Sequence, residues 1–468
     1  MPDSGVGGSR TVITPNESVT FVPRPEPSEG PAQVPVLLIV GDTKGRIPPG
    51  KARVMPFGGT VVVGRREATQ SEPGQSFLVL PDRMVSSQHL AIGRAPEEAA
   101  YELTDLSSSN GTVVDGEAVE SSVRLHDGSL IFAGSHVMVF RTVTRAELAA
   151  IQAELSNPLG PVPTVNPAFA VVCKKLRVLA EAGEEVLLVG ETGVGKEVYA
   201  RAIHKASGRT GRFVAINCAA IPRELVESEL FGYARGAHSQ AAMAKPGIIE
   251  EADGGTLFLD EIGEMAPALQ TKLLRFTQDR LLVPVGGVHA RRIEARIVAA
   301  TSRTAPATES GGLRADLAQR LGAEPIRIPP LRERIEDLGA IAAYLLGEER
   351  AKPFELAAFQ ALCLHTWPGN VRELEKTMTS AEALARASES VDFEHLPAAI
   401  SSAPRIRSTP GRRKARPPPN AADLEALMRR FRGNMMRVAR ELDRKPALVY
   451  RWAKRFGLDV GDFRPPEE

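Results

Sequence analysis

The sequence predicts a multidomain protein: an all-β sandwich, an α/β domain that ends in helices, and a small all-α unit. Three observations predict this order. Short β-like runs separated by Gly, Asn, Asp and Ser recur from about Val34 to Val143. Apolar strand patterns alternate with helical patterns between about Asn166 and Pro330, as in a parallel α/β sheet. Short amphipathic helical patterns fill residues 421–458, and a chain of 468 residues has room for roughly three domains.

The composition predicts a cytoplasmic protein that does not enter a membrane. Hydrophobic residues make up 43% of the chain and charged residues 25%, as in ordinary globular proteins. No apolar run approaches the roughly 20 residues of a membrane helix, and the N-terminus lacks the apolar core of a secretory signal. Cys173, Cys218 and Cys363 are odd in number and far apart, which favours buried, inert thiols over a disulfide or a metal site.

The charge is distributed unevenly along the chain, although the net charge is only +1. From Ser401 to the end, the chain has 17 Lys and Arg and 8 Asp and Glu, which is a net charge of +9. The residues before Ser401 therefore carry a net charge of −8. A basic C-terminal segment on an acidic body predicts a terminal module that binds a polyanion.

Changes in composition and periodicity suggest seven segments along the chain. They are a disordered Gly/Pro/Ser-rich tail (1–33), the β sandwich (34–143), a linker with a short helix (144–164), the α/β domain (165–335), its helical extension (336–400), a basic Pro-rich linker (401–420) and the small helical unit (421–460).

The stretch "VLLVGETGVGKE" reads as a strand, a glycine loop and the start of a helix, which is the pattern of a phosphate-binding loop. Its glycines let the backbone N–H groups face a phosphate, and the helix N-terminus and Lys196 add positive charge. Glu197 stands where a Ser or Thr hydroxyl would usually contact magnesium. The predicted nucleotide-binding residues are Gly190, Glu191, Thr192, Gly193, Val194, Gly195, Lys196 and Glu197.

A second apolar strand, "GGTLFLDEIGEM", ends in Asp260 and Glu261. We expect this strand beside the first in a parallel sheet, so that both strand ends open into one crevice. Asp260 would hold magnesium, directly or through water, and Glu261 would polarise the attacking water. Together the two strands predict hydrolysis of ATP with Mg²⁺.

Residues from about 165 to 400 resemble the central domain of bacterial enhancer-binding proteins, the AAA+ ATPases that activate sigma-54 RNA polymerase. The motifs that carry this resemblance occur in order: "GETGVGKE", "FVAINCAAIP", "ESELFGYARGA", "EEADGGTLFLDEIGEM", "QTKLLRF", "PPLRERIEDL" and "WPGNVRELE". The resemblance implies an AAA+ α/β subdomain, a helical lid and a homo-oligomeric ring, which we expect to be a hexamer, because such ATPases supply arginines to a neighbouring subunit.

The same resemblance implies roles for individual residues. Asn217 matches a switch residue that holds Glu261 back, and Arg372 matches the nucleotide sensor of the lid. Arg314 and Arg320 match the two arginines that reach the γ-phosphate of the neighbouring subunit, although a solvated helix face is the alternative. Ser302 stands where Asn is usual; because Ser can still hydrogen-bond a phosphate or water, we expect slower turnover rather than none.

The loop that contacts sigma-54 in this family reads Gly-Ala-Phe-Thr-Gly-Ala, and this chain departs from it. Its residues are Gly236, Ala237, His238, Ser239, Gln240 and Ala241. An imidazole buries less apolar area than an aromatic ring and costs more to dehydrate, so the replacement of Phe weakens the contact. Two alternatives stay open: the loop no longer engages sigma-54, or the partner carries matching changes.

The β-rich region resembles a forkhead-associated domain, a reader of phosphothreonine. "VVGRR", "MVSSQHLAI" and "LTDLSSSNGTVVDG" carry the resemblance and supply Arg65, Ser86, Ser87, Ser109 and Asn110 as predicted phosphopeptide-binding residues. Arg65 and Ser86 would take the phosphate and Asn110 the peptide backbone, and His89 would brace the loops. The resemblance implies input from a Ser/Thr kinase, with Thr11 or Thr14 of the chain itself as one possible ligand. A sandwich that only docks on the ring is the alternative.

Leu424 to Leu458 resembles the Fis-type helix-turn-helix that ends enhancer-binding proteins. Val438, Leu442, Leu448 and Trp452 fit a small core at helical spacing. The predicted DNA-binding residues are Arg444, Lys445, Arg451, Lys454 and Arg455.

These features predict a bacterial transcription regulator in which a phosphothreonine-sensing domain controls an AAA+ ATPase that binds enhancer DNA and remodels the sigma-54 RNA polymerase holoenzyme. One rival is a phospho-regulated DNA-binding factor that does not engage sigma-54. Another is a phosphopeptide scaffold with a relic ATPase. The rival scaffold is disfavoured because Lys196, Asp260, Glu261, Arg314 and Arg320 are all present.

Overall fold

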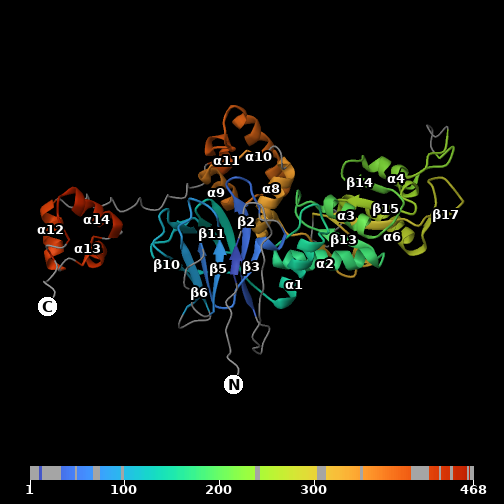
Figure 1. Cartoon of the computed structure of the whole chain (residues 1–468). Helices are drawn as coiled ribbons and strands as arrows, with labels where there is room; N and C mark the ends of the chain where they lie inside the picture. Colours follow the sequence, from blue (N-terminus) through green and yellow to red (C-terminus); the bar gives the residue numbers. More distant parts are fainter. Residues whose placement is uncertain are drawn as a thin grey trace, which may run out of the picture. The chain divides into compact units, whose positions relative to one another are not determined.

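The computed structural model describes residues 10–12, 33–47, 50–66, 74–95, 100–237, 243–302, 312–347, 352–401, 421–431, 434–442, 446–460 and 463 (Figure 1). The chain divides into two units, residues 1–407 and 408–468, each described by itself below. Among the described residues, no helix has the length and apolar character needed to cross a bilayer. Cys173, Cys218 and Cys363 are buried and free, as predicted.

The N-terminal region is a sandwich of two sheets, as the alternating β-like runs predicted. One sheet has the strand order β1-β5-β4-β6-β7-β10 and the other β3-β2-β12-β11-β8-β9. The strands are β1 (Arg10–Val12), β2 (Val34–Asp42), β3 (Val54–Pro56), β4 (Thr60–Gly64), β5 (Gln75–Val79), β6 (Leu90–Arg94), β7 (Tyr101–Asp105), β8 (Thr112–Val114), β9 (Glu117–Ala118), β10 (Ser122–Leu125), β11 (Leu130–Ala133) and β12 (His136–Val143).

The prediction of disorder for residues 1–33 is wrong at one place. Arg10–Val12 forms β1, which pairs in parallel with β5, and Thr11 lies opposite Leu78. A short run of β-branched residues can add to an open sheet edge through its backbone alone, without the periodicity that the sequence lacks here. Thr14 lies outside the described residues.

Strand β2 is buried on both faces. Leu37 and Ile39 belong to the core between the two sheets. Val36, Leu38 and Val40 point the other way, into a second core that includes the lid helices of the ATPase region. This double burial explains why "VPVLLIV" is continuously apolar rather than alternating.

A capped helix connects the sandwich to the α/β region. Helix α1 (Arg145–Ser156) starts with a capping box, in which Glu147 N donates to Thr144 Oγ1 and Thr144 N donates to Glu147 Oε2. This is the short connecting helix that "RAELAAIQAEL" predicted. Helix α2 (Pro167–Glu181) follows, with the side chain of Asn166 as its N-cap.

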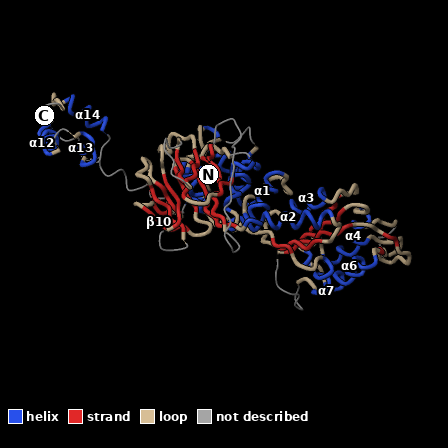
Figure 2. Tube along the Cα trace, turned by 60° about the horizontal axis from the view of Figure 1, so that its bottom comes forward, coloured by secondary structure: helices blue, strands red, loops and turns tan. Residues whose placement is uncertain are grey.

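The α/β region has a five-stranded parallel sheet with the order β14-β15-β18-β13-β19. Helices α2 and α3 lie on one side of the sheet and α6 and α7 on the other (Figure 2). The remaining elements of the region are β13 (Val186–Val189), α3 (Lys196–Ala206), β14 (Phe213–Asn217), α4 (Arg223–Phe231), α5 (Ile248–Glu251), β15 (Thr256–Asp260), α6 (Pro267–Asp279), β16 (Leu281–Leu282), β17 (Arg291–Arg292), β18 (Arg296–Thr301), α7 (Ala315–Leu321) and β19 (Ile326–Arg327).

The prediction that the two motif strands lie next to each other in the sheet is wrong. Strand β15, which ends at Asp260, does not pair with β13, because β18 lies between them. The shared crevice survives this correction, since all these strands are parallel and their carboxyl ends meet at the same sheet edge. The intervening strand also brings its own terminal residues to that edge.

A helical lid follows the sheet and packs on the sandwich. Its helices are α8 (Leu338–Leu346), α9 (Leu356–Leu364), α10 (Asn370–Leu384) and α11 (Ala398–Ser401), preceded by two short 3-10 turns at Leu331–Glu333 and Ile335–Asp337. One continuous core joins outward-facing residues of β2, β8, β11 and β12 to α1, α2 and the lid. The sandwich therefore docks on the ATPase region, whatever else it binds.

Buried polar contacts reinforce this docking. Glu336 is fully buried and pairs with Arg141 of β12, with an Nη2–Oε1 distance of 3.2 Å. Arg53, also buried, donates through Nη2 to the Glu336 carbonyl at 2.9 Å. Asn166 Nδ2 donates to Glu336 Oε1 at 2.8 Å, and Asp337 accepts from Thr164 Oγ1 at 2.5 Å. The turn at Ile335–Asp337 is thus tied to both the sandwich and the linker.

In the part of the second unit that the structure describes, three short helices surround a small core: α12 (Ala421–Arg430), α13 (Met435–Glu441) and α14 (Pro446–Arg455). Of the predicted core residues, Val438 is fully buried, whereas Leu442 and Trp452 pack at its margin. The side chain of Leu448 lies outside the described residues. Among the described side chains of α14, Val449 and Ala453 are buried.

Candidate functional site

The phosphate-binding loop joins β13 to α3, and its glycines meet two physical requirements. Gly193 and Gly195 have φ of 82° and 99°, in the left-handed region that glycine adopts without strain. A Cβ on Gly193 would also lie 2.5 Å from the Gly369 carbonyl oxygen of the lid. The loop and the lid therefore approach each other too closely for a side chain.

The lid contacts this loop through hydrogen bonds and an ion pair. Asn370, buried at the start of α10, donates through Nδ2 to Glu191 Oε2 and to the Thr192 carbonyl, both at 3.1 Å. Arg332 pairs with Glu191 at 2.6 Å, and hydrogen bonds from Arg332 and Asn370 lower the pKa of Glu191 to about 2. No role was predicted for Asn370, although it lies in the motif "WPGNVRELE".

The sheet edge brings the predicted catalytic groups together. Lys196 is buried; its Nζ donates to the Gly190 carbonyl at 2.9 Å and lies 3.5 Å from Glu261 Oε1. Asp260 ends β15, and burial raises its pKa while the charge of Lys196 opposes the rise. Glu261 has φ of 52° and ψ of 46°, a left-handed conformation uncommon for a residue with a side chain. Such strain is typical of functional positions.

Asn217 does not make the contact with Glu261 that the resemblance implied. Its Nδ2 faces Asp260 Oδ2 at 3.5 Å, and its Oδ1 accepts from Ala219 N at 2.9 Å. Glu261 instead accepts two hydrogen bonds from Ser302, which follows β18. Because β18 lies between β13 and β15, Ser302 reaches Glu261, a contact that was not predicted from the sequence.

This sheet edge offers few protein ligands for a divalent cation. Glu197 points away, since its carboxylate pairs with Arg201 at 2.6 Å and is half exposed. No group of three His, Cys, Asp or Glu suited to a metal occurs in the part of the chain that the structure describes. Mg²⁺ commonly binds through one or two carboxylates together with substrate phosphates, and Asp260 supplies such a carboxylate.

The predicted phosphopeptide residues lie together on loops of the sandwich. Arg65 N donates to the Ser86 carbonyl at 2.8 Å, and Ser109 N donates to Ser86 Oγ at 3.0 Å. Asn110 Nδ2 donates to the Met84 carbonyl at 2.7 Å. Among the described residues, the buried Nε of Arg65 has no hydrogen-bond partner.

His89 braces these loops, as predicted. It is fully buried, Ser86 N donates to its Nδ1 at 3.1 Å, and its Nε2 lies 3.1 Å from the Gly111 carbonyl. Since Nδ1 accepts, Nε2 carries the proton and donates to Gly111. Burial lowers the pKa of His89, which favours the neutral ring.

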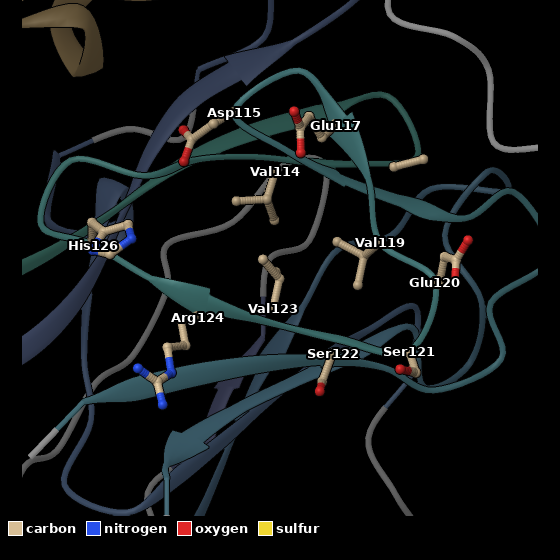
Figure 3. A pocket seen from close by; sticks show the side chains of 11 residues that line it. Val114, Asp115, Glu117, Val119, Glu120, Ser121, Ser122, Val123, Arg124 and His126 are labelled. Carbon is tan, nitrogen blue, oxygen red and sulfur yellow. The ribbon is translucent and has the colours of Figure 1, made fainter. Parts of the chain in front are cut away.

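A cavity of about 500 Å³ lies elsewhere on the sandwich (Figure 3). Its walls come from the β8–β9 hairpin and β10, with Asp115, Glu117, Arg124 and His126 among them. None of the predicted phosphopeptide-binding residues lines it. It is therefore distinct from the Arg65 loops.

Comparison with known proteins decides the family. Residues 163–327 match the sigma-54 interaction domain, residues 332–412 the AAA+ ATPase lid domain and residues 61–134 the FHA domain. The chain is 39% identical over 313 residues to the transcriptional regulatory protein GlrR of Escherichia coli (strain K12), covering 65% of this chain and 69% of GlrR. The chain belongs to the sigma-54-dependent transcriptional activator family. It is an AAA+ ATPase.

Other relatives share only part of their length with the chain. The transcriptional regulatory protein XylR of Pseudomonas putida is 44% identical over 240 residues, which are 49% of this chain and 42% of XylR. Among solved structures, NtrX from Brucella abortus in complex with ADP is 30% identical, with a TM-score of 0.46, and the match covers 62% of this chain and 68% of NtrX. The chain therefore spans less than half the length of XylR.

The arginines assigned from the sigma-54 activator family are accessible. Arg314 precedes α7 and pairs with Asp316 at 2.7 Å, with its side chain 40% exposed. Arg320 is exposed on the last turn of α7 and donates to the Thr277 carbonyl at 2.8 Å. Arg372 is exposed on α10, and its Cβ lies near Gly193 of the phosphate-binding loop.

The activator loop of the family is only partly described. Its stem is formed by pairing of Tyr233 with Lys245 and Val285, and Gly236 has φ of 81°. Ala237 follows, and His238, Ser239, Gln240 and Ala241 lie outside the described residues. In the C-terminal unit, Arg451, Lys454 and Arg455 are exposed on α14, whereas Arg444 and Lys445 lie outside the described residues.

Proposed function

We propose that this protein is an ATP-hydrolysing transcription regulator that binds enhancer DNA and remodels sigma-54 RNA polymerase under the control of a phosphothreonine signal. The observation that carries the proposal is the meeting of Lys196, Asp260 and Glu261 at one sheet edge, within a region that matches the sigma-54 interaction domain. Such a regulator acts in the bacterial cytoplasm, where promoter DNA and polymerase are found.

The ATPase residues would have separate roles in hydrolysis. Lys196 and the loop N–H groups would bind the terminal phosphates, and Glu261 would take a proton from the attacking water. Asp260 would hold Mg²⁺, which neutralises phosphate charge when bound. Arg314 and Arg320, both accessible, would complete the site of a neighbouring subunit in a homo-oligomer, which we propose is a hexamer.

The basic helix α14 supports the DNA-binding part of the proposal. Arg451, Lys454 and Arg455 project from it into solvent, which suits contacts with phosphates and base edges. The preceding linker adds positive charge along the chain. With the family membership, these features favour enhancer DNA as the polyanion.

The activator loop favours a second candidate, a DNA-binding regulator that does not remodel sigma-54 polymerase. His238 replaces the aromatic tip, and Ser239 and Gln240 also differ from the family pattern. Burying an imidazole is less favourable in free energy than burying a phenyl ring, so this loop would bind the family's partner more weakly.

One experiment separates the two candidates: transcription from a sigma-54 promoter carrying an enhancer site, in a purified system, with ATPase measured in parallel. The unaltered protein is compared with the variant His238→Phe, Ser239→Thr, Gln240→Gly. We expect the unaltered protein to activate, and the variant to activate as well or better. Hydrolysis without activation, rescued by the three substitutions, would establish the second candidate instead.

A phosphothreonine peptide is the ligand we propose for the Arg65 loops. Arg65, whose backbone N donates to the Ser86 carbonyl at 2.8 Å, carries a guanidinium that can donate to a phosphate. Ser109 N donates to Ser86 Oγ at 3.0 Å, so the hydroxyls of these two residues lie close together and can add donors. The input would then come from a Ser/Thr kinase. Thr11 remains a candidate ligand in a second copy of the chain, although its own backbone is paired in β1.

We expect Arg65→Ala to weaken binding to a degenerate phosphothreonine peptide library by roughly 10- to 100-fold, since each hydrogen bond to a charged group is worth about 1.5–3 kcal/mol. Fluorescence anisotropy of the full chain measures this. Arg66→Ala is the matched control, because Arg66 is the exposed neighbour, and it should bind as the wild type does. Equal binding by the Arg65 variant, or equal binding of unphosphorylated peptides, would favour a sandwich that serves only for docking.

A further inference from the structure

The segment of residues 331–337 joins the parallel sheet to the lid, and its first half contacts the phosphate-binding loop. Arg334 is buried, and its Nη2 donates to the Val194 carbonyl of this loop at 2.9 Å. Arg332 pairs with Glu191 of the same loop at 2.6 Å. Losing the Val194 acceptor would cost a charge-assisted hydrogen bond at a buried site. The position of the segment therefore depends on the backbone of the loop.

The second half of this segment contacts the sandwich. Glu336 Oε1 lies 3.2 Å from Nη2 of Arg141, and Arg53 Nη2 donates to the Glu336 carbonyl at 2.9 Å. Gly339, in the first turn of α8, lies directly against β2, because a Cβ there would be 2.1 Å from the Val40 carbonyl oxygen. The lid and the sandwich thus fit too closely for a side chain at this point, and a shift between them would break a buried ion pair.

Strand β12 connects this contact to the loop between β5 and β6, which carries Ser86 and is called the Ser86 loop below. Arg141 lies within β12, and Ser135 comes directly before that strand. Ser135 donates to Asp82 Oδ2 of the Ser86 loop through its backbone N at 3.0 Å and its Oγ at 2.8 Å. Asp82 Oδ1 in turn accepts from Met84 N at 3.0 Å. Because β12 is paired with β2 on one side and β11 on the other, it links its two ends rigidly.

We propose that a nucleotide in the phosphate-binding loop orders the Ser86 loop of the sandwich through residues 331–337 and β12, so that nucleotide and phosphopeptide strengthen each other's binding. The second ligand rests on the phosphothreonine role proposed for the Arg65 loops. A nucleotide restrains the backbone of its loop, and groups hydrogen-bonded to that backbone lose freedom with it. A phosphopeptide that binds a loop already ordered loses less conformational entropy, and the coupling is reciprocal in free energy.

Hydrogen–deuterium exchange of the full chain, followed by mass spectrometry with and without ADP, tests the proposal. We expect ADP to slow exchange in the phosphate-binding loop and, by about 3-fold or more, in residues 82–86 and 134–136. Strand β10 lies at the far edge of its sheet and should exchange at an unchanged rate. Slower exchange confined to the phosphate-binding loop would overturn the proposal. Unchanged exchange everywhere would contradict nucleotide binding itself, and the coupling with it.

The variant Arg141→Met tests the route. ADP should still slow exchange in the phosphate-binding loop of this variant, but its effect on residues 82–86 should fall below about 1.5-fold, because the link between Glu336 and β12 is cut. Asp127→Asn removes only the half-exposed partner of Arg141 and should keep the wild-type response. A full ADP response of residues 82–86 in the Arg141 variant would overturn the route through β12.

Peptide binding separates this coupling from the phosphothreonine role on which it depends. Fluorescence anisotropy with the degenerate phosphothreonine peptide library should show binding about 5-fold or more tighter with ADP than without it. Equal affinity in both conditions would overturn the mutual strengthening. An absence of library binding in both conditions would contradict the phosphothreonine role, whereas the exchange data would still decide whether the two loops are coupled.

Discussion

Replacing Glu261 by Gln is expected to lower kcat for ATP by roughly 100- to 10,000-fold, the usual contribution of a general base. The amide has nearly the same shape and can still accept hydrogen bonds from Ser302, but it cannot take a proton from water. Phosphate release measures kcat. Binding of a fluorescent ATP analogue measures affinity, which should stay within about 3-fold because Glu261 is not a predicted phosphate ligand.

Glu324→Gln is the matched control for this variant. Glu324 is an exposed carboxylate, 74% accessible, that pairs with Lys175 away from the sheet edge. We expect its kcat to equal that of the wild type. If the Glu261 variant kept more than about a tenth of the wild-type rate, another group would have to activate the water.

Replacing Arg141 by Met is expected to destabilise the docking of the sandwich on the lid by about 3–5 kcal/mol, the usual effect of removing one partner from a buried ion pair. Burial raises the pKa of Glu336, and Arg141 supplies the charge that opposes this rise. Met keeps the apolar stem of Arg141 and leaves the Glu336 carboxylate with the amide of Asn166 as its remaining side-chain donor. A lower first transition in a thermal melt, with faster proteolysis between sandwich and lid, is the expected result.

Asp127→Asn is the control, because Asp127 is the half-exposed second partner of Arg141. Its loss should change the stability by less than about 1 kcal/mol, as for other surface pairs. Adding Glu336→Gln to Arg141→Met should recover part of the loss, since the buried group is then neutral. An unchanged melt for Arg141→Met would show that the apolar core alone holds the two regions together.

Local patterns predicted much of this fold because their causes are local. The strand, glycine loop and helix around Lys196 form where the sequence places them, since glycine φ angles and a helix N-terminus depend on nearby residues. The sandwich was predictable for the same reason. The Arg65, Ser86 and Asn110 loops also converge, because they follow β4, β5 and β7, which run in the same direction in one sheet.

The prediction failed where partners come from distant segments. The strand of Asp260 was placed beside β13, because strand order does not follow from the order of motifs in a chain. Asn217 was assigned to Glu261 from resemblance, yet its amide is engaged elsewhere.

By itself, the sequence predicted the sandwich, the α/β domain with its helical lid and the small helical unit, in this order, together with the glycine loop before Lys196. These features depend on turns, periodicity and side-chain chemistry within a few neighbouring positions. Only the tertiary structure decided that Ser302 holds Glu261 and that β2 is buried against the lid as well as in its own sandwich. Both depend on contacts between segments that are far apart along the chain, and the free energy of such contacts appears only once the sheet is assembled.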